Sequence, residues 1–590
     1  MTRPTPPAQR ALDGHARSRD SRPSPLPTPP LARAAGLLLF YAAAVAWLTW
    51  PLASQLSTHV PNTKFACESD GGHALWALAW ETHALVTDPA RLPDANIYHP
   101  ASNALFYGPT AFGALPLFGP VFLASGNPVL AMNLVFLGGL VLTAWTLHWV
   151  AARWTGSLLA GFVAAGTLLT TRWTLWHWIP MVPYWAILLY FPLVMFLAAQ
   201  TARSGRHLPL LLLLLVLQSL IDPVYLASAL FLPLGLLALA RLLRRSTRRG
   251  GMLLLLTLGV ATLCLLPVYA GYARVRAENP SLRTQTVWVR ENLTQLPEAL
   301  TAPQAPTAVP GAVLLLVLVG ALAFAARARR AGAAERGVWM HGAFWVAAGL
   351  LLSLEPPLFW NGIRIRLPHD LVPWAYEVLR APERLGVATL MGLAVLAAAA
   401  FAECTRRIRA VPRRPGLRSL AEPALAALVM GAMYAEYLWG PAYSVASWPT
   451  LPGSYPVLER SQGPPGFVAA LRRSRGPLLE LPIDVRHHHG RAANLQARAM
   501  VRSISHWRPL LNGYSSFWPE GFRERMELAS RLPDPGALAA LRRETGLEHV
   551  LVRRGPATLA WEALAERGGR DDLRVVAWTA DDLLFAVGGP

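Results

Sequence analysis

A series of long apolar segments, separated by short connections that carry arginine, constrains the fold of this chain most. A helix needs about 20 apolar residues to cross the hydrocarbon core of a bilayer. Segments near this length recur throughout residues 31–440. We predict about eleven membrane spans, near 34–54, 129–150, 157–172, 181–200, 208–221, 223–241, 251–271, 309–327, 338–356, 385–403 and 420–440. The chain is therefore expected to be a polytopic α-helical membrane protein.

The composition agrees with this interpretation. Hydrophobic types make up 53% of the 590 residues and charged types 15%, whereas about a quarter of a soluble globular protein is charged. A chain this apolar is not a disordered protein. The exception is the N-terminal end, which is rich in Pro and Arg. We expect residues 1–30 to be a disordered cytoplasmic tail rather than a signal peptide.

The net charge of +20 comes almost wholly from arginine. In a soluble domain such a charge would suggest nucleic acid, but here it is concentrated in short connections between apolar segments. With the N-terminus in the cytoplasm, the Arg-dense connections all fall on one side, at 153, 203–206, 244–249, 327–336 and 406–418. We therefore predict a multi-pass protein of the plasma (inner) membrane that contacts membrane lipids and no nucleic acid. Its N-terminus is expected in the cytoplasm and its C-terminus outside.

This orientation depends on residues 111–125, a short apolar segment that holds Pro116 and Pro120. If this segment were a full span, the arginine clusters at 244–249 and 406–418 would lie outside the cell. We therefore expect an interfacial or re-entrant helix on the outer side, whose backbone must be covered by protein or water.

The two longest polar regions then outside the membrane are a first outer loop, residues 55–128, and a C-terminal region, residues 441–590, and two shorter outer loops are expected at 272–308 and 357–384. In the second region, strand patterns at 477–483, 548–553 and 573–578 alternate with helical patterns near 464–475, 490–503, 520–531 and 535–545. Such alternation predicts a small α/β extracytoplasmic domain. Aromatic and polar side chains gather in its segment 506–519, which suits either carbohydrate or the edge of a packed core: Trp507, Asn512, Tyr514, Ser515, Phe517 and Trp518.

The first outer loop contains a helical pattern over residues 74–86, with Trp76 and Trp80 four residues apart. Because tryptophan favours the membrane interface, we expect this helix to lie along the membrane surface. Asp70 lies just ahead of it and is followed by two glycines. Asp70 is either a helix cap or a carboxylate aimed into a cavity, where it can remove a proton from a hydroxyl or help hold a divalent cation.

Other candidates are charged side chains near the ends of spans. Arg172 and His177 lie among tryptophans and either hold a lipid phosphate or belong to an aromatic belt with a snorkelling arginine. Asp222 is either functional or part of an Asp-Pro turn. Arg380 and Arg384 are four residues apart and either meet a phosphate or contact lipid headgroups and nearby glutamates.

Several short stretches, taken in their order along the chain, resemble a known family. They are Ser69-Asp70 with Leu75 to Trp80, Asp88-Pro89, Ala95 to Pro100, Gly126-Asn127-Pro128, Leu379 to Gly386, and Arg508 to Ser515. Together with the long first outer loop and the terminal outer domain, they resemble the GT-C superfamily of polyprenyl-phosphate-sugar-dependent membrane glycosyltransferases. The resemblance is closest to a bacterial group that has a C-terminal extracytoplasmic domain.

The resemblance implies a GT-C-like fold and an inverting hexosyl- or pentosyltransferase of the cell envelope. Such an enzyme moves a sugar from a polyprenyl-phosphate donor to a glycan, lipid or protein acceptor. Asp70 matches the family's acidic residue, so it is the expected base, with Mg²⁺ or Mn²⁺ as an ion it can help to hold. Tyr98 and His99 lie in one matching stretch and join the substrate-binding candidates Arg172, His177, Asp222, Arg380 and Arg384.

Two further observations bear on the class of function. The chain has no GxSxG, Walker A or GxGxxG motif in a strand–helix context, which argues against a nucleotide cofactor and suits a lipid-linked donor. The alternative function is a non-catalytic lipid or polysaccharide transport or assembly protein. It would need charged residues deep in the apolar segments, and the sequence has essentially none there.

Overall fold

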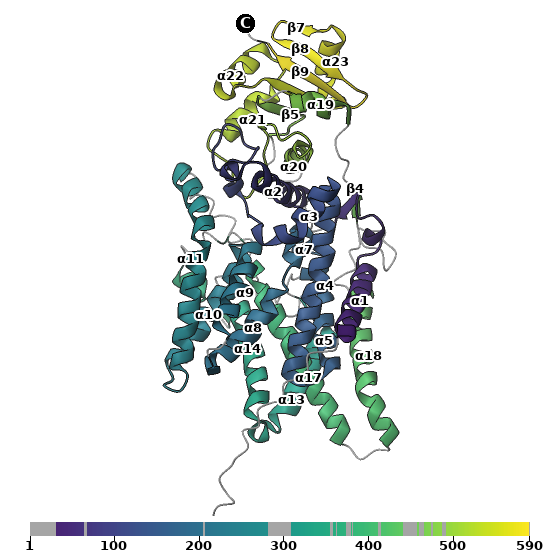
Figure 1. The fold of residues 1–590 in the computed structure, drawn as a ribbon, viewed down its shortest axis with the longest axis vertical. Helices are drawn as coiled ribbons and strands as arrows, with labels where there is room; N and C mark the ends of the chain where they lie inside the picture. The colour runs from purple at the N-terminus through teal and green to yellow at the C-terminus, as the bar shows by residue number, and fades with distance from the viewer. Residues whose placement is uncertain are drawn as a thin grey trace, which may run out of the picture.

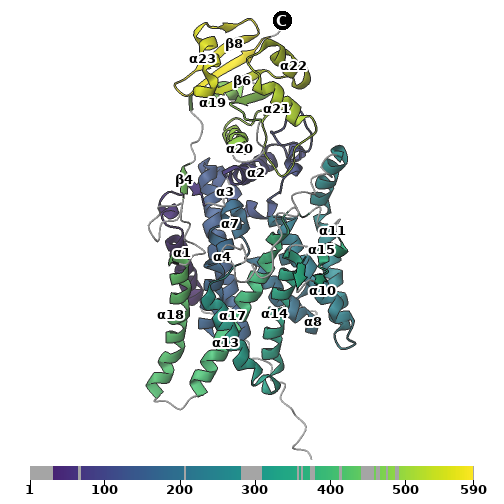
Figure 2. The same ribbon diagram turned by 180° about the vertical axis from the view of Figure 1, so that it is seen from behind.

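The computed structural model describes residues 31–63, 68–204, 207–280, 308–354, 358–360, 363–372, 379, 381–410, 415–439, 457–459, 465–473, 476–485 and 491–588. The predicted tail 1–30 and the candidate Arg380 lie outside these residues. A bundle of long helices carries a small α/β domain at one end (Figures 1 and 2).

Each of the eleven predicted apolar segments contains a helix of this bundle. The helices are α1 (Leu31–Leu48), α4 (Pro128–Thr155), α5 (Leu158–Leu169), α8 (Tyr190–Ser204), α9 (Leu208–Ile221), α10 (Tyr225–Leu242), α11 (Arg248–Glu278), α13 (Gly311–Ala325), α14 (Ala333–Ser353), α17 (Val387–Ala410) and α18 (Pro415–Trp439). Among the described residues, four helices are long and apolar enough to cross a membrane, and a pair bent by 58° makes a possible fifth. The number of eleven spans therefore stays a prediction.

Helix α17 lies at the centre of the bundle and is buried over nearly all of its length. Small residues bring it close to its neighbour α14. A Cβ atom on Gly349 would collide with Thr389, and one on Gly392 would lie 2.6 Å from the backbone nitrogen of Val346. Small side chains let two helix backbones approach and gain van der Waals contact where lipid supplies no hydrophobic driving force.

The chain between α5 and α8 differs from the predicted spans 157–172 and 181–200. Helix α5 ends at Leu169, and two single-turn helices, α6 (Arg172–Leu175) and α7 (Trp178–Met181), and a 3₁₀ turn, η5 (Pro183–Ala186), precede α8. Pro180 and Pro183 lack the N–H that a continuous helix needs. Trp173, Trp178 and Trp185 are buried in this broken stretch, so irregular backbone here is covered by protein.

Helix α2 (Glu68–Thr87) begins at Glu68 rather than Ala74, so Asp70 lies inside its first turn and not ahead of it. The helix lies between the bundle and the C-terminal domain (Figure 1) and packs against α20 (Arg491–Ser503). Trp76 is fully buried and Trp80 is 5% exposed. Both indoles are covered by protein rather than exposed, and the location of this helix along the membrane surface stays a prediction.

Residues 111–125 form a short 3₁₀ turn, η4 (Phe112–Ala114), and the helix α3 (Leu115–Ser125). Helix α3 packs against α2 and α4. A short helix is therefore confirmed here, whereas its depth in a bilayer stays a prediction.

The C-terminal domain has a five-stranded sheet in the order β5 (Leu478–Leu481), β6 (His549–Arg553), β9 (Asp582–Val587), β8 (Leu573–Trp578), β7 (Gly569–Arg570). Strands β5 and β6 are parallel, and the other pairs are antiparallel. The three predicted strands and four predicted helices are present. The predicted helices correspond to α19 (Pro465–Arg473), α20, α21 (Phe522–Ser530) and α22 (Pro535–Thr545), whereas β7, β9 and α23 (Leu559–Glu566) were not predicted.

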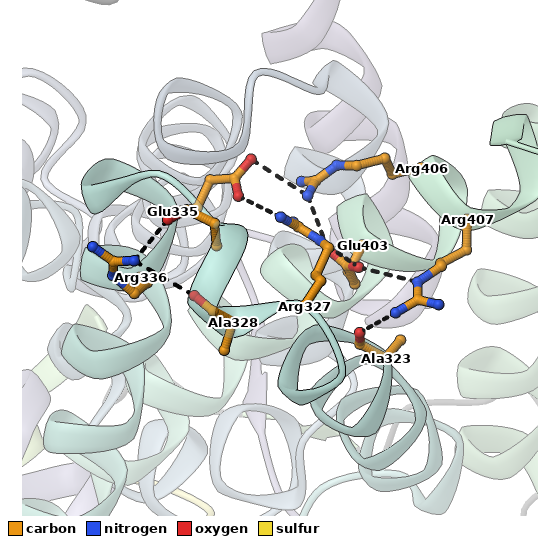
Figure 3. A network of polar contacts seen from close by, with 9 residues as sticks. Ala323, Arg327, Ala328, Glu335, Arg336, Glu403, Arg406 and Arg407 are labelled. Atoms are coloured by element: carbon orange, nitrogen blue, oxygen red, sulfur yellow. Dashed lines mark hydrogen bonds and ion pairs between the residues drawn. The ribbon is translucent and has the colours of Figure 1, made fainter.

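The described parts of the arginine-bearing connections lie at the end of the bundle away from the C-terminal domain (Figures 1 and 2). There Glu403 of α17 is 1% exposed and accepts hydrogen bonds from Arg327, the shortest of them 2.6 Å long (Figure 3). Arg406 and Arg407 approach the same carboxylate at 3.0 and 3.5 Å. This placement matches the predicted separation of basic connections from the outer domain. Which end faces the cytoplasm stays a prediction.

Candidate active site

A cavity of about 340 Å³ lies between the C-terminal domain and the nearer end of the bundle. Three parts of the chain form its wall. The bundle supplies mainly aromatic and apolar side chains: Trp178, Met181, Val182, Tyr184, Tyr225 and Ala381, with Arg384. The first outer loop supplies Asp70, His73, Ala74, Tyr98 and Pro109. The C-terminal domain supplies most of the polar groups, which include Asp484, Gln496, Tyr514, Ser515, Ser516 and Arg523.

Asp70 lies in the first turn of α2, where the helix dipole favours an acidic side chain. It is partly buried, and the Tyr514 hydroxyl donates a 2.7 Å hydrogen bond to its Oδ1 atom. Two residues earlier, Glu68 accepts hydrogen bonds of 2.7 and 3.0 Å from Arg498 of α20. These two contacts from the C-terminal domain hold the start of α2 and direct Asp70 to the cavity.

His73 lies one turn further along α2 and is 6% exposed. One of its ring nitrogens, Nε2, is 3.2 Å from the Ser515 hydroxyl. Burial lowers the pKa of His73 to about 4, so the imidazole is neutral near pH 7. A Cβ atom on Gly108 would collide with both His73 and Ser515, which explains why glycine occupies that position.

Arg384 provides the cation of the bundle wall. It lies in the 3₁₀ turn η9 (Pro382–Gly386), and its guanidinium lies 4.2 Å from the ring centre of Trp178, 4.5 Å from that of Tyr225 and 5.3 Å from that of Trp185. Aromatic faces attract a cation without using its N–H groups. Its buried Nε has no hydrogen-bond partner in the described part of the chain. The guanidinium can therefore bind an anion in the cavity.

Tyr98 lies in the cavity wall but is only 1% exposed. The Tyr98 hydroxyl donates a 3.1 Å hydrogen bond to the backbone oxygen of Phe517. The Tyr98 backbone N–H donates a 3.1 Å hydrogen bond to the backbone oxygen of Asn512. A Cβ atom on Gly513 would collide with the Tyr98 ring. The predicted role in binding substrate stays a prediction, whereas these contacts hold the segment that carries Tyr514.

Among the candidates that the structure describes, His177, Arg172, His99 and Asp222 do not line this cavity. His177 packs its ring 4.5 Å from that of Trp178, which places it beside the wall. Arg172 is 4% exposed at the start of α6. His99 hydrogen-bonds to the backbone oxygen of Thr545 at 3.1 Å and lines a different cavity.

Asp222 is fully buried between α9 and α10. Its Oδ1 accepts hydrogen bonds from the backbone N–H groups of Val224 at 2.9 Å and Tyr225 at 2.6 Å, and its Oδ2 accepts one from the indole of Trp185 at 3.0 Å. Asp222 thus holds a turn and also two of the aromatic residues that surround Arg384.

The structure therefore brings together Asp70, Arg384 and Tyr98 of the predicted residues. Tyr514, Ser515 and Trp518 were noted in the sequence as a carbohydrate platform or a core edge, and they line the cavity. The aromatic surroundings of Arg384 and the polar side chains Asp484, Gln496 and Arg523 were missed. No sequence signal marks them, because each lies in a separate segment.

The described residues show no cluster of side chains that would bind the predicted Mg²⁺ or Mn²⁺ ion. In the described ranges, no group of three or more His, Cys, Asp and Glu side chains lies close enough to hold a metal ion. Asp70 and the Tyr514 hydroxyl that contacts it do not make a complete set of metal ligands, so the metal ion stays a prediction.

Glu81 lies on α2, outside the candidate spans, and is fully buried. Its Oε1 accepts a 2.9 Å hydrogen bond from the backbone N–H of Ala111, and its Oε2 has no partner within the described residues. Burial raises the pKa of Glu81 from 4.5 to about 8. The folded protein thus keeps a proton that the unfolded chain releases between these pH values.

We therefore expect stability to fall as the pH rises from 6.5 to 8, by on the order of 1 kcal/mol per pH unit. Glu81→Gln should remove this slope, because an amide neither ionises nor loses the contact with Ala111. Thermal unfolding in detergent across this range measures it, with Glu68→Gln as the partly exposed control that keeps the slope. A Glu81→Gln profile parallel to that of the unmodified protein would show that Glu81 does not titrate here.

Comparison with known proteins finds similarity at the level of structure and none at the level of sequence. The sequence matches no family model and no curated protein. The fold is similar to that in the crystal structure of ArnT from Cupriavidus metallidurans in the apo state, with 13% identity and a TM-score of 0.43 over 95% of this chain and 100% of that chain. At this identity and TM-score the likeness assigns neither a family nor a reaction.

Proposed function

We propose that the protein is a membrane glycosyltransferase that moves a sugar from a polyprenyl-phosphate donor to a glycan, lipid or protein acceptor outside the cytoplasm. One observation carries this proposal. A single cavity at the end of an apolar helix bundle holds the carboxylate of Asp70 and the guanidinium of Arg384. The reaction needs a base for a hydroxyl and a cation for a phosphate, and these two groups supply them.

The donor would bind from the bundle side. Its lipid tail is apolar and suits the wall formed by Met181, Val182 and Ala381, since burial of apolar surface is favourable. Its phosphate would meet Arg384, whose N–H groups match phosphate oxygens. Trp178 and Tyr225 hold the guanidinium by their ring faces and so orient it before the donor arrives.

The acceptor would bind from the side of the C-terminal domain. Asp70 takes the proton of the acceptor hydroxyl, and the hydroxyl oxygen forms a bond to the anomeric carbon of the sugar. The bond from that carbon to the phosphate oxygen breaks on the opposite face, and the electron pair leaves with polyprenyl phosphate. Arg384 stabilises the charge that develops on this leaving group, and the configuration at the anomeric carbon is inverted.

The test is a transfer assay with the full chain reconstituted in liposomes. Radiolabelled polyprenyl-phosphate hexose and pentose donors are supplied with a bacterial envelope fraction, which contains glycan, lipid and protein acceptors. We expect release of polyprenyl phosphate together with labelled acceptor. Movement of intact donor between leaflets with no release of polyprenyl phosphate would contradict the proposal and support the transport alternative.

A further inference from the structure

A second cavity, of about 240 Å³, lies beside the other half of α2. Its wall includes Trp80, His83, Asp88 and Arg91 from the first outer loop and Trp507 from the C-terminal domain. Asp70 and His83 are thirteen residues apart on α2, which corresponds to about 20 Å along the helix axis. The two cavities are therefore separate sites along one helix.

Aromatic rings form one part of this wall. The rings of His83 and Trp507 are stacked, with centres 4.3 Å apart and planes at 9°. Trp80 meets the Trp507 ring edge-on at 5.8 Å and is fixed by a 3.0 Å hydrogen bond from its indole to the backbone oxygen of Leu92. Trp507 is only partly buried, so part of this rigid aromatic surface remains accessible.

The backbone at Trp507 is strained. Its φ angle is +55°, in a region that a bulky residue rarely adopts. Its N–H donates to the backbone oxygen of Ser503 at 2.7 Å, and the next N–H donates to Nδ1 of His506 at 3.1 Å. Strain of this kind persists where the surroundings enforce it, commonly at ligand sites. Here it holds an indole against the cavity.

Polar groups form the rest of the wall. Asp88 and Arg91 are exposed, and in the described part of the chain neither makes an ion pair. The ring nitrogens of His83 likewise have no hydrogen-bond partner among the described residues, and burial lowers the pKa of His83. The neutral imidazole offers one donor and one acceptor, which matches a sugar hydroxyl.

We propose that this second cavity is a subsite for a neutral glycan chain. The C–H face of a sugar ring packs on an aromatic surface, and Asp88, Arg91 and His83 supply donors and acceptors for its hydroxyls. Two carboxylates, Asp88 and Asp94, share the wall with one guanidinium, which disfavours an anionic glycan.

The assignment of this glycan as the acceptor rests on the proposed function. Segment 507–518 supplies Trp507 to the second cavity and Tyr514 and Trp518 to the first. Because His83 and Asp70 are about 20 Å apart along α2, a glycan held in the second cavity would need several sugars to bring its end near Asp70. The acceptor would then be a growing glycan rather than a single small molecule.

The experiment measures binding of three neutral tetrasaccharides, chitotetraose, cellotetraose and maltotetraose, to the full chain in detergent by calorimetry. Trp507→Gly removes the indole and suits the positive φ angle, so the fold should persist. Arg91→Ala changes only an exposed side chain. Trp578→Ala is the control, because Trp578 is 50% exposed on β8 and does not line this cavity.

We expect the unmodified protein and Trp578→Ala to bind at least one tetrasaccharide equally, and Trp507→Gly and Arg91→Ala to bind it about tenfold more weakly. Failure of all three probes to bind, or equal binding by all variants, would overturn the subsite. Asp70→Asn should keep this binding. If Asp70→Asn also kept full transfer, the proposed function would fail while the glycan site stood.

Discussion

Asp70→Asn is expected to lower the rate of sugar transfer by about 10²–10⁴-fold, the range that a general base contributes. An amide has nearly the shape of the carboxylate but cannot take the proton of an acceptor hydroxyl. Its side-chain oxygen can still accept the hydrogen bond that the Tyr514 hydroxyl donates to Asp70 at 2.7 Å. The variant should therefore fold and insert into the membrane like the unmodified protein.

The rate is measured as polyprenyl phosphate released in liposomes, next to a thermal unfolding profile of each variant. Asp571→Asn is the matched control, because it makes the same change at an exposed side chain of the C-terminal domain that does not line the cavity. Tyr514→Phe keeps the carboxylate and should cost less than Asp70→Asn. Undiminished transfer by Asp70→Asn would exclude Asp70 as the base.

Glu403→Gln is expected to destabilise the helix bundle by about 2–3 kcal/mol. The Glu403 side chain is 1% exposed, and its carboxylate forms ion pairs with Arg327, Arg406 and Arg407 at distances of 3.5 Å or less (Figure 3). Removal of one partner from a buried ion pair costs about 3–5 kcal/mol. Partial exposure of the three arginines, from 22% to 49%, lowers that figure, because solvent screens the charges left behind.

The measurement is thermal or denaturant unfolding in detergent. Glu335→Gln is the control, because Glu335 contacts two of the same arginines, Arg327 at 2.8 Å and Arg406 at 3.3 Å, but is 41% exposed. Its loss should cost at most about 1 kcal/mol. Equal effects of the two substitutions would show that burial of Glu403 does not determine the strength of the network.

The segment around Asp70 shows which structural features a local sequence pattern predicts and which it does not. The sequence predicts a helix with Trp76 and Trp80 and an acidic residue near its start, and the structure has these features in α2. The start of the helix was misplaced, because residues before Ala74 show no apolar periodicity. The sequence did not predict that both indoles are buried, or that Trp80 contacts Trp507 of a domain encoded more than 400 residues later.

The apolar helices, the positions of the basic connections between them, and most strands and helices of the C-terminal domain can be predicted from local sequence patterns. These features depend on the order of neighbouring side chains along the chain. The folded chain alone reveals that Asp70 contacts Tyr514 and shares a cavity with Arg384, and that Trp507 stacks on His83. Such contacts join segments hundreds of residues apart, so they depend on how whole helices and a domain pack rather than on any local pattern.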